Sequence, residues 1–294
     1  MISVLIPTYN YKCYTLAHDL QKQLEASGED YEVIVAEDGG KDQVVAISNH
    51  RINDLPCCRY IRRTQNVGRA AIRNFLANEA KGEWLLFMDS DAKVVADDYI
   101  GKYIAAMKDG DADVIVGGLM NPEKLPSPIV TLRYRYEKTA EYQRPAAYRQ
   151  RYPYARFTAF NVMMHRSVLQ EIPFDESCRE YGYEDVLMGI EMMQKGKKIR
   201  HIDNPLMHLG FESNEVFLRK TEIALKTLHR LEDRMFSETS IGSVVMKVRR
   251  YHLVGTIAFT FRAFRNIMKR NLYGSAPNLK VFAFYKLGYY LNLK

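Results

Sequence analysis

The stretch that decides the fold is Glu83-Trp84-Leu85-Leu86-Phe87-Met88-Asp89-Ser90-Asp91. Residues 84 to 88 form an uninterrupted apolar run, which is too short to span a membrane and has the length of a strand buried on both faces. Ligands bind open α/β sheets at the carboxyl ends of parallel strands, and carboxylates one residue apart can share a hard divalent cation. The stretch therefore predicts a central strand that ends in a metal-diphosphate site. A plain polar turn is the alternative.

Length and cysteine content limit the class of protein. The chain has 294 residues, of which 47% are hydrophobic, so it can form one large α/β domain with a helical appendage. The four cysteines (Cys13, Cys57, Cys58 and Cys178) form no C-x-x-C pair, which argues against a zinc ribbon or a disulfide framework. The N-terminus has neither the basic region nor the long apolar core of a signal peptide. We therefore expect a cytoplasmic location.

The net charge of +7 is unevenly distributed. From Thr239 to Lys294 there are ten Lys or Arg residues and no Asp or Glu. Phe, Tyr, Leu, Ile and Val are interspersed with these cations, whereas a nucleic-acid-binding arm would contain fewer aliphatic residues. An anionic membrane surface is thus the expected partner of the tail, and nucleic acid is not.

Short apolar segments alternate with helical patterns along the first 120 residues. Strands are expected near residues 3–6, 31–36, 59–62, 84–88 and 114–116, with helices that include 14–24 and 99–107. This alternation predicts parallel βαβ units in a nucleotide-binding sheet. Polar, turn-forming residues follow three of the strands, at 7–10, 37–40 and 89–91. Because such strand ends meet at one edge of the sheet, they predict one site.

Four ordered motifs, at residues 4–10, 33–40, 66–74 and 85–91, resemble those of the family 2 inverting glycosyltransferases. They read Val-Leu-Ile-Pro-Thr-Tyr-Asn, Val-Ile-Val-Ala-Glu-Asp-Gly-Gly, Asn-Val-Gly-Arg-Ala-Ala-Ile-Arg-Asn and Leu-Leu-Phe-Met-Asp-Ser-Asp. The resemblance covers roughly the first 120 residues. It implies an α/β fold of GT-A type, with a mostly parallel, Rossmann-like sheet flanked by helices. A C-terminal helical extension is expected in addition, from the length of the chain and the helical spacing of apolar residues in the tail.

The resemblance also implies roles in binding a nucleotide-sugar donor. Pro7 and Tyr9 would pack against the base, Asp38 would accept a hydrogen bond from uracil, and Arg73 would contact the diphosphate. Asp89 would approach the ribose and the metal. A solvated helix arginine is the alternative for Arg73. The remaining donor candidates are Asn66, Ser90 and Glu37, and Glu37 stands where Asp is more usual.

A divalent cation held by carboxylate can neutralise the charge on a leaving diphosphate. Asp91, together with Asp89, is the expected ligand of Mg²⁺ or Mn²⁺. By the resemblance, His208 is a candidate third ligand, and a structural histidine is the alternative.

Glu184 and Asp185 precede apolar residues at helical spacing, so they are expected to open a helix. The helix dipole favours an ionised carboxylate there, as a general base requires, although ordinary capping is the alternative. In the resembling family the Asp of this pair is the base, which assigns the role to Asp185. The acceptor-binding candidates are Glu184, Tyr183 and Asn161.

Between Leu125 and Phe157 the chain is rich in Arg and Tyr and is interrupted by Pro126, Pro128, Pro145 and Pro153. Loops around one or two short helices are expected there, over the acceptor side. The expected domains are a catalytic domain at 1–212, with a donor half at 1–120 and an acceptor half at 121–212, and a basic amphipathic extension at 213–294.

These features predict an inverting, metal-dependent, non-processive glycosyltransferase. It would move a hexosyl or N-acetylhexosaminyl group from a UDP-sugar to a glycan or lipid-linked acceptor in surface polysaccharide synthesis. The Gln-x-x-Arg-Trp motif of processive synthases cannot occur, because Trp84 is the only tryptophan. A nucleotidyltransferase is the second hypothesis, but it would need a glycine-rich loop near the N-terminus to hold the triphosphate, and residues 7–10 are not such a loop. A non-catalytic sugar-binding protein is the third hypothesis.

The tail contains an uncharged run from Tyr251 to Phe261, well short of the roughly 20 residues that span a bilayer. We expect its apolar stripe to lie in the membrane interface at the inner face of the membrane. Packing on the protein itself, or in a homodimer, is the alternative. The stripe consists of Val254, Ile257, Ala258, Phe261, Phe264, Ile267 and Met268.

Overall fold

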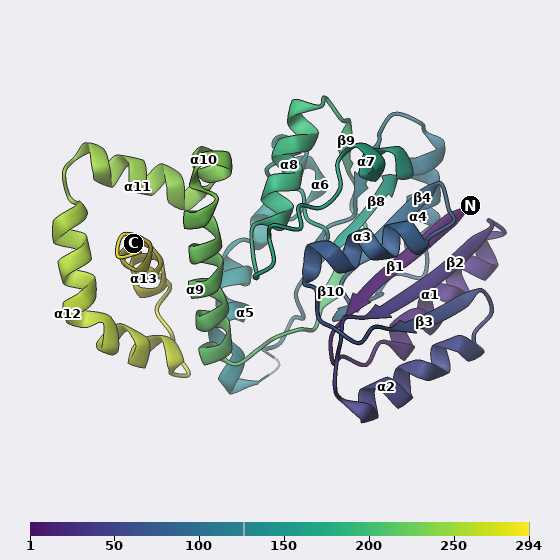
Figure 1. Ribbon diagram of the computed structural model, residues 1–294, viewed down its shortest axis with the longest axis horizontal. Helices are drawn as coiled ribbons and strands as arrows, with labels where there is room; N and C mark the ends of the chain where they lie inside the picture. Colours follow the sequence, from purple (N-terminus) through teal and green to yellow (C-terminus); the bar gives the residue numbers. More distant parts are fainter. Residues whose placement is uncertain (126, 294) are drawn as a thin grey trace. The chain divides into compact units, whose positions relative to one another are not determined.

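The structure is a computed structural model that describes residues 1–125 and 127–293 (Figure 1). Pro126 and Lys294, counted above among the prolines and the cations, lie outside the described residues. The chain forms two compact units. The sheet unit comprises Met1–Met120, Tyr142–Arg179 and Glu184–Gly210, and the helical unit comprises Asn121–Glu141, Glu180–Tyr183 and Phe211–Lys294.

This division differs from the expected domains in the middle of the chain. The stretch 121–141 was expected in the acceptor half of the catalytic domain, but its contacts are with the C-terminal helices. Its helix begins with Thr131 and Leu132, and Leu132 is buried among apolar residues that lie far along the sequence. Sequence spacing alone could not reveal those contacts.

A seven-stranded sheet forms the centre of the sheet unit, with strand order β3-β2-β1-β4-β8-β6-β9. All neighbours pair in parallel except β8, which is antiparallel to both β4 and β6. The strands are β1 (Ile2–Thr8), β2 (Tyr31–Glu37), β3 (Cys58–Arg62), β4 (Trp84–Met88), β6 (Val114–Val116), β8 (Asn161–His165) and β9 (Ile199–His201). A second sheet contains β5 (Ala92–Lys93), β10 (Leu206–His208) and β7 (Leu119–Met120).

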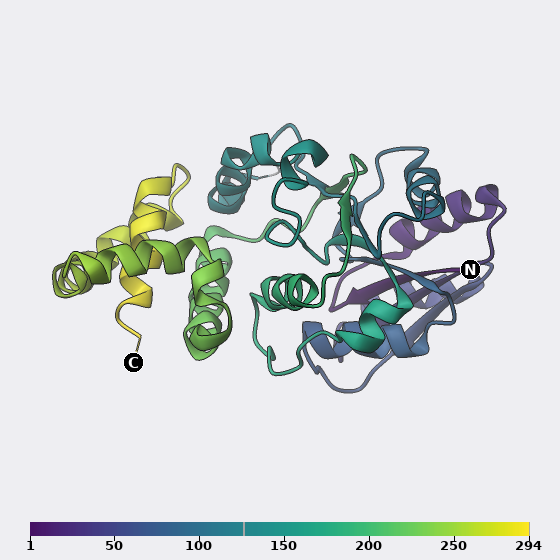
Figure 2. The same ribbon diagram turned by 90° about the horizontal axis from the view of Figure 1, so that it is seen from above.

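Helices cover both faces of the large sheet (Figure 2). The helices of the sheet unit are α1 (Tyr14–Ser27), α2 (Gln43–His50), α3 (Arg69–Glu79), α4 (Tyr99–Lys108), α6 (Ala146–Arg149), α7 (Arg166–Glu171) and α8 (Glu184–Gln194), with short 3₁₀ turns at Arg51–Asp54 and Glu141–Gln143. The predicted α/β architecture with a mostly parallel sheet is confirmed. The antiparallel β8 and the small second sheet were not predicted.

β4 owes its continuous apolar sequence to burial on both faces. Leu86 and Met88 belong to the core that α1 and α4 cover, whereas Leu85 and Phe87 belong to the core that α3, α7 and α8 cover. Successive side chains of a strand point to opposite faces, so a strand covered on both sides needs apolar residues at every position. The predicted central strand is confirmed at both of its ends.

The helical unit contains α5 (Thr131–Thr139), α9 (Asn214–Arg230), α10 (Glu232–Met235), α11 (Ser240–Arg250), α12 (Val254–Tyr273) and α13 (Leu279–Tyr290), with 3₁₀ turns at Pro128–Val130 and Phe236–Glu238. In Figure 1, α9, α11 and α12 surround α13, which is viewed end-on. Gly288 lets α13 approach α12, because a Cβ there would lie 2.6 Å from the ring of Phe261.

The structure divides the apolar stripe expected in the membrane interface. Ala258, Phe261 and Met268 are buried, and Phe261 and Met268 lie in the core that α12 shares with α13. For these three residues the membrane expectation is wrong, and the alternative of packing on the protein itself holds. Phe264 and Ile267 remain exposed. No helix among the described residues is long and apolar enough to cross a membrane.

Candidate active site

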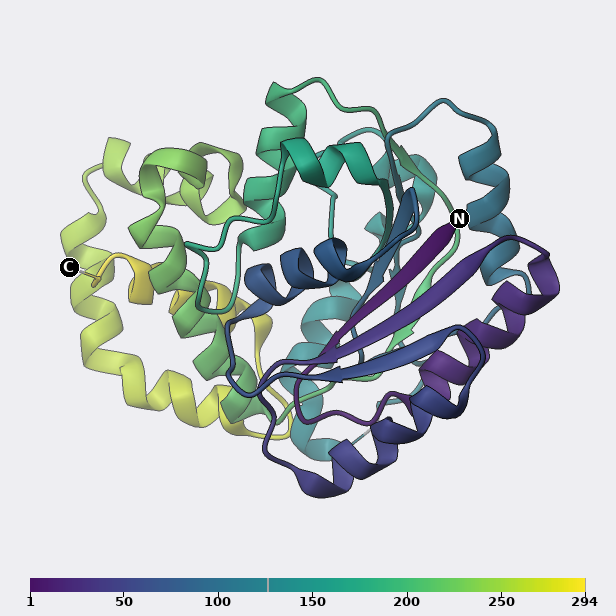
Figure 3. The same ribbon diagram turned by 45° about the vertical axis from the view of Figure 1, so that its right-hand side comes forward.

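The ends of β1, β2 and β4 bring the three polar motifs to one edge of the sheet (Figure 3). β1 pairs in parallel with the other two strands and lies between them. The backbone N–H of Asp38 donates to the carbonyl of Thr8 over 2.9 Å, which fixes the end of β2 beside the end of β1. The expected clustering of strand ends is therefore confirmed, at the edge where open α/β sheets bind ligands.

Glu37 and Asp38 organise the backbone at this edge. Asp38 is 4% exposed, and its two carboxylate oxygens accept hydrogen bonds from the backbone N–H groups of Val67 and Gly68, each over 3.0 Å. Glu37 accepts the backbone N–H of Asn10 over 2.9 Å, and burial raises the pKa of its carboxyl. A uracil ring would compete with two amides for Asp38, so the uracil contact stays a prediction.

Asp89 is held by two arginines from α3. Its Oδ2 accepts from Arg69 over 2.6 Å and its Oδ1 accepts from Arg73 over 2.9 Å. Arg69 and Arg73 are four residues apart, so they lie on one face of the helix. Burial alone would raise the pKa of Asp89, but the two guanidinium groups outweigh it and hold the pKa below its usual value. Asp89 is therefore ionised at neutral pH.

The same arginines reach the acidic pair that opens α8. Arg73 lies 3.5 Å from a carboxylate oxygen of Glu184 and 3.8 Å from one of Asp185. Arg69 lies 3.6 Å from Glu184. We call these five side chains the charged cluster: Arg69, Arg73, Asp89, Glu184 and Asp185. The alternative of a solvated Arg73 is wrong, because the residue is 1% exposed, whereas its diphosphate contact stays a prediction.

Asp185 combines a fixed orientation with a raised pKa. Its Oδ2 accepts the hydroxyl of Thr158 over 3.0 Å and the backbone N–H of Ala159 over 3.1 Å, and its Oδ1 has no hydrogen-bond partner among the described residues. Burial, followed by the charge of Glu184, raises the pKa of Asp185 to about 6 against the opposing effect of the arginines. The side chain is 27% exposed. Such a carboxylate can accept a proton near neutral pH.

Asp91 and His208 are the residues that fit a divalent cation. The Oδ1 of Asp91 is buried without a hydrogen-bond partner, and its Oδ2 lies 3.5 Å from Nε2 of His208. Gly210 has no side chain, and a Cβ there would collide with the Asp91 carboxylate. Asp89 faces arginines instead of this pair. Among residues 1–125 and 127–293, no group of three or more His, Cys, Asp or Glu side chains could hold a metal. The pair thus fits a cation that also takes oxygens from substrate and water.

Asn161 does not belong to the site. Its Oδ1 accepts from the hydroxyls of Tyr99 and Tyr103, each over 2.7 Å, and its Nδ2 donates to the carbonyls of Gly118 and Asn204. The residue is 0% exposed, and the amide group is fully used inside the fold. The expected acceptor role of Asn161 is therefore wrong, because an acceptor sugar cannot reach it.

The other candidates differ in exposure. Tyr9 follows the end of β1 and is 56% exposed. Pro7 lies within β1, where it pairs with Ala36 of β2. Ser90 is half-buried between the two aspartates, and Asn66 is exposed. Tyr183 belongs to the helical unit, where burial raises the pKa of its hydroxyl to about 12. Their contacts with donor or acceptor stay predictions.

Three side chains of the site were not predicted from the sequence. Arg69 lies within the third motif, four residues before Arg73, so helical spacing could have indicated it. Tyr11 is the second. Burial, and next the charge of Asp91, raise the pKa of the Tyr11 hydroxyl. Thr158 carries no signal in the sequence, because only the fold brings it to Asp185.

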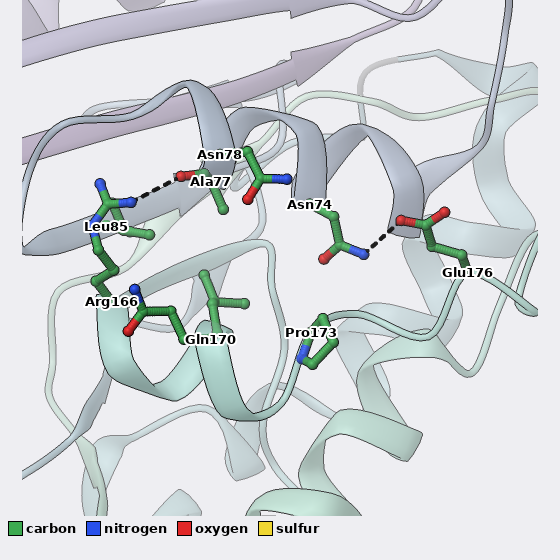
Figure 4. Close-up of a pocket in the computed structure, with 9 residues that line it drawn as sticks. Asn74, Ala77, Asn78, Leu85, Arg166, Gln170, Pro173 and Glu176 are labelled. Carbon is green, nitrogen blue, oxygen red and sulfur yellow. Dashed lines mark hydrogen bonds between the residues drawn. The ribbon is translucent and has the colours of Figure 1, made fainter.

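Two cavities lie beside α3. The side of α3 that lines them is not the side that carries Arg69 and Arg73. One has a volume of about 270 Å³ and is lined by α3, α7 and the following turn, with Asn74 hydrogen-bonded to Glu176 at its edge (Figure 4). Arg166 at the other end donates to the carbonyls of Ala77 and Ala80. The second, of about 540 Å³, is lined by residues that include Asn66 and Arg179. Neither cavity contains a member of the charged cluster.

Comparison with known proteins places these motifs in a family. A family model described as "Glycosyl transferase family 2" matches residues 3–173. An uncharacterized glycosyltransferase of Haemophilus influenzae is 32% identical over 107 residues, which are 36% of this chain and 42% of that protein. The poly(ribitol-phosphate) β-N-acetylglucosaminyltransferase TarS of Staphylococcus aureus is 35% identical over 102 residues, 34% of this chain and 17% of that protein. The chain thus spans less than half the length of these relatives.

Solved structures share the fold. The S. aureus TarS fragment 1–349 in complex with UDP has a TM-score of 0.53 at 18% identity, over 98% of this chain and 89% of that one. The mannosyltransferase PcManGT of Pyrobaculum calidifontis, solved with GDP-Man and Mn²⁺, has a TM-score of 0.51 at 16% identity, over 79% of this chain and 64% of that one. At these identities the likeness concerns the fold alone.

Proposed function

Since this chain belongs to glycosyltransferase family 2, we propose that it is an inverting, non-processive glycosyltransferase that uses a nucleotide diphosphate sugar. The acceptor is a glycan or a lipid-linked sugar in surface polysaccharide synthesis. The observation that carries the proposal is the position of Asp185, which opens α8, in the charged cluster. The cluster lies at the edge of the sheet where Asp38 follows β2 and where Asp89 and Asp91 follow β4.

Asp185 acts as the general base. Its pKa of about 6 leaves it mostly ionised at neutral pH, yet basic enough to take a proton from a sugar hydroxyl as that hydroxyl attacks. Thr158 and Ala159 hold one of its oxygens in place. A single displacement that needs only a base inverts the configuration of the transferred sugar.

The leaving diphosphate requires positive charge at the same edge of the sheet. A divalent cation, when bound, neutralises part of the developing charge, and Asp91 with His208 would hold it. Arg69 supplies a second positive group, because its side chain is 43% exposed while it contacts Asp89. Arg73 is buried and keeps Asp89 and Glu184 in fixed positions.

The donor we propose is a UDP-sugar. S. aureus TarS has been solved with UDP and with UDP-GlcNAc, whereas PcManGT has been solved with GDP-Man, so members of this fold class bind different bases. The match to TarS by sequence as well as by fold favours UDP here. Both a hexosyl and an N-acetylhexosaminyl group fit this proposal.

A donor screen tests the function. Purified protein is incubated with UDP- and GDP-sugars, Mn²⁺ and a panel of glycan and lipid-linked acceptors, and the released nucleotide is measured. NMR of the product gives the anomeric configuration, which is expected to be opposite to that of the donor. Asp185→Asn should release nucleotide at a background rate, while Glu171→Gln, an exposed acid outside the site, should match the wild type.

Two results would contradict the proposal. Retention of the donor's configuration would exclude a single displacement with Asp185 as base. Consumption of nucleoside triphosphate with release of pyrophosphate, and no sugar transfer, would instead identify a nucleotidyltransferase.

A further inference from the structure

One side of α12 is exposed and carries both large apolar and cationic side chains. Phe259 and Ile267 are 67% and 65% exposed. Arg262, Ala263 and Arg270 are exposed as well. We call these five residues the outer face of α12. In Figure 1, α12 forms one edge of the helical unit, with α13 on its inner side.

Helical spacing places these five residues on one side. Phe259, Ala263 and Ile267 follow one another at intervals of four residues. Arg262 comes three residues after Phe259, and Arg270 comes three residues after Ile267. The opposite side of the helix carries the buried residues Ala258, Phe261, Met268 and Leu272. The core of the helical unit therefore accounts for one side of α12. On the outer face, Arg262 donates a hydrogen bond to the side chain of Asn292 over 3.4 Å, and the apolar side chains Phe259 and Ile267 lie outside this core.

The charges of the outer face are not balanced within the helix. Arg265 and Lys269 of α12 pair with Glu222 of α9. Arg249 of α11 pairs with Glu232. No acidic residue occurs between Thr239 and Leu293, so Arg262 and Arg270 have no acidic neighbour on their own helix. The outer face thus combines exposed apolar area with positive charge.

This combination fits an anionic lipid surface better than a second copy of the chain. An interfacial helix inserts its apolar side chains at the boundary between headgroups and acyl chains, while arginines reach the anionic headgroups. A symmetric dimer through the same face would bring Arg262 and Arg270 of two copies together without an acid from either α12.

We propose that the outer face of α12 binds anionic phospholipid and holds the protein at a membrane surface. Phe259 and Ile267 insert into the interface, and Arg262 and Arg270 contact lipid phosphates. Lipid binding by this face requires no catalytic activity, so it can fail or succeed independently of the proposed glycosyl transfer.

Vesicle flotation tests the proposal with the full chain. Phosphatidylcholine vesicles with and without phosphatidylglycerol are mixed with the protein at low and high salt. The protein should float with the anionic vesicles at low salt and much less at high salt, because exposed charges are screened. Phe259→Ser with Ile267→Ser should lower the partition coefficient at least about tenfold. Arg262→Gln with Arg270→Gln should lower it about fivefold per arginine at low salt.

Matched substitutions on the sheet unit serve as controls. Val44 and Ile47 of α2 are 65% and 71% exposed, so Val44→Ser with Ile47→Ser removes a similar exposed apolar area elsewhere. Lys41→Gln with Lys81→Gln removes two exposed cations. Both control variants should float like the wild type, and all variants should keep the wild-type circular dichroism spectrum and melting temperature.

Three outcomes would overturn the proposal. They are the absence of flotation, equal flotation with neutral and anionic vesicles, and equal loss in the α2 control and the α12 variant. A dimer seen by light scattering that Phe259→Ser with Ile267→Ser dissociates, without any effect on flotation, would assign the face to self-association.

Discussion

Asp185 is the residue whose electrostatics bear most directly on activity. Its neutral form is favoured by burial and by Glu184, so its pKa of about 6 lies well above that of a free aspartate. A base acts only when ionised. We therefore expect kcat to be nearly constant above pH 7 and to fall about tenfold per pH unit below pH 6.

Replacement of Asp185 by Asn should abolish that pH dependence along with most of the activity. We expect kcat to fall by a factor of about 10² to 10⁴, because the carboxylate accepts the proton of the attacking hydroxyl. The KM for the donor should change little, because the carboxylate is not needed to bind the donor. Steady-state kinetics between pH 5 and pH 9 would measure both effects. A variant that keeps the wild-type kcat would exclude Asp185 as the base.

Thr158 is expected to act as a positioning residue through Asp185. Thr158→Val removes a hydrogen bond to the ionised carboxylate, so the half-maximal pH of kcat should move upward by about one unit. The loss in activity should be largest near pH 6 and small at pH 8. Thr158→Ser keeps the hydroxyl and should retain the wild-type profile. A uniform loss at every pH would indicate damage to the fold instead.

Asp91 should couple donor affinity to the metal. We expect wild-type protein to bind the UDP-sugar more tightly with Mn²⁺ than without it, and Asp91→Ala to lose most of that difference, because a principal oxygen ligand is gone. Isothermal titration calorimetry with and without Mn²⁺ gives both affinities. The exposed Asp97 offers the matched control Asp97→Ala. Equal wild-type affinities with and without metal would remove Asp91 from a metal role.

At the scale of elements, the contact between α12 and α13 depends on a glycine. A Cβ at Gly288 would lie 2.6 Å from three atoms of Phe261, so Gly288→Ala should lower the free energy of unfolding by about 1 to 3 kcal/mol. Gly255, near the start of α12, has no atom within 4 Å of such a Cβ. Gly255→Ala should be neutral or stabilising by up to about 1 kcal/mol. Chemical denaturation measures both, and equal effects would contradict the close approach.

Elements also show where prediction from sequence succeeds and where it stops. β4 was predicted at both ends because four of its five positions are buried and its apolar run ends at Asp89. β8 is apolar only from Val162 to Met164, and its antiparallel direction depends on pairing with β4 and β6, which no local pattern encodes. Asp38, Asp89 and Asp91 follow their strands and could be predicted as site residues. The pairing of Asp89 with Arg69 and Arg73 could not, because it depends on where the fold places α3.

At the scale of the whole molecule, the helical unit is assembled from three separate stretches of chain. Two of them, Asn121–Glu141 and Glu180–Tyr183, interrupt the sheet unit in sequence, so the expected boundary at residue 212 separates stretches that pack together. A truncation after Glu238 would remove α12 and α13 from the core that contains Leu132 and Leu218. Point substitutions on exposed faces therefore test this unit more cleanly than truncation does.

The central position of α13 has a consequence for the order in which the chain is made. α5 and α9 leave the ribosome long before α13, yet Phe282 and Tyr285 of α13 fill the core that these helices share. Until residue 285 has emerged, the core that contains Leu132 and Leu218 lacks these two aromatic side chains and stays incomplete. Incompletely buried apolar surface is the condition under which nascent chains engage chaperones or aggregate. The sheet unit, in which β1, β2 and β4 are made early, does not face this delay.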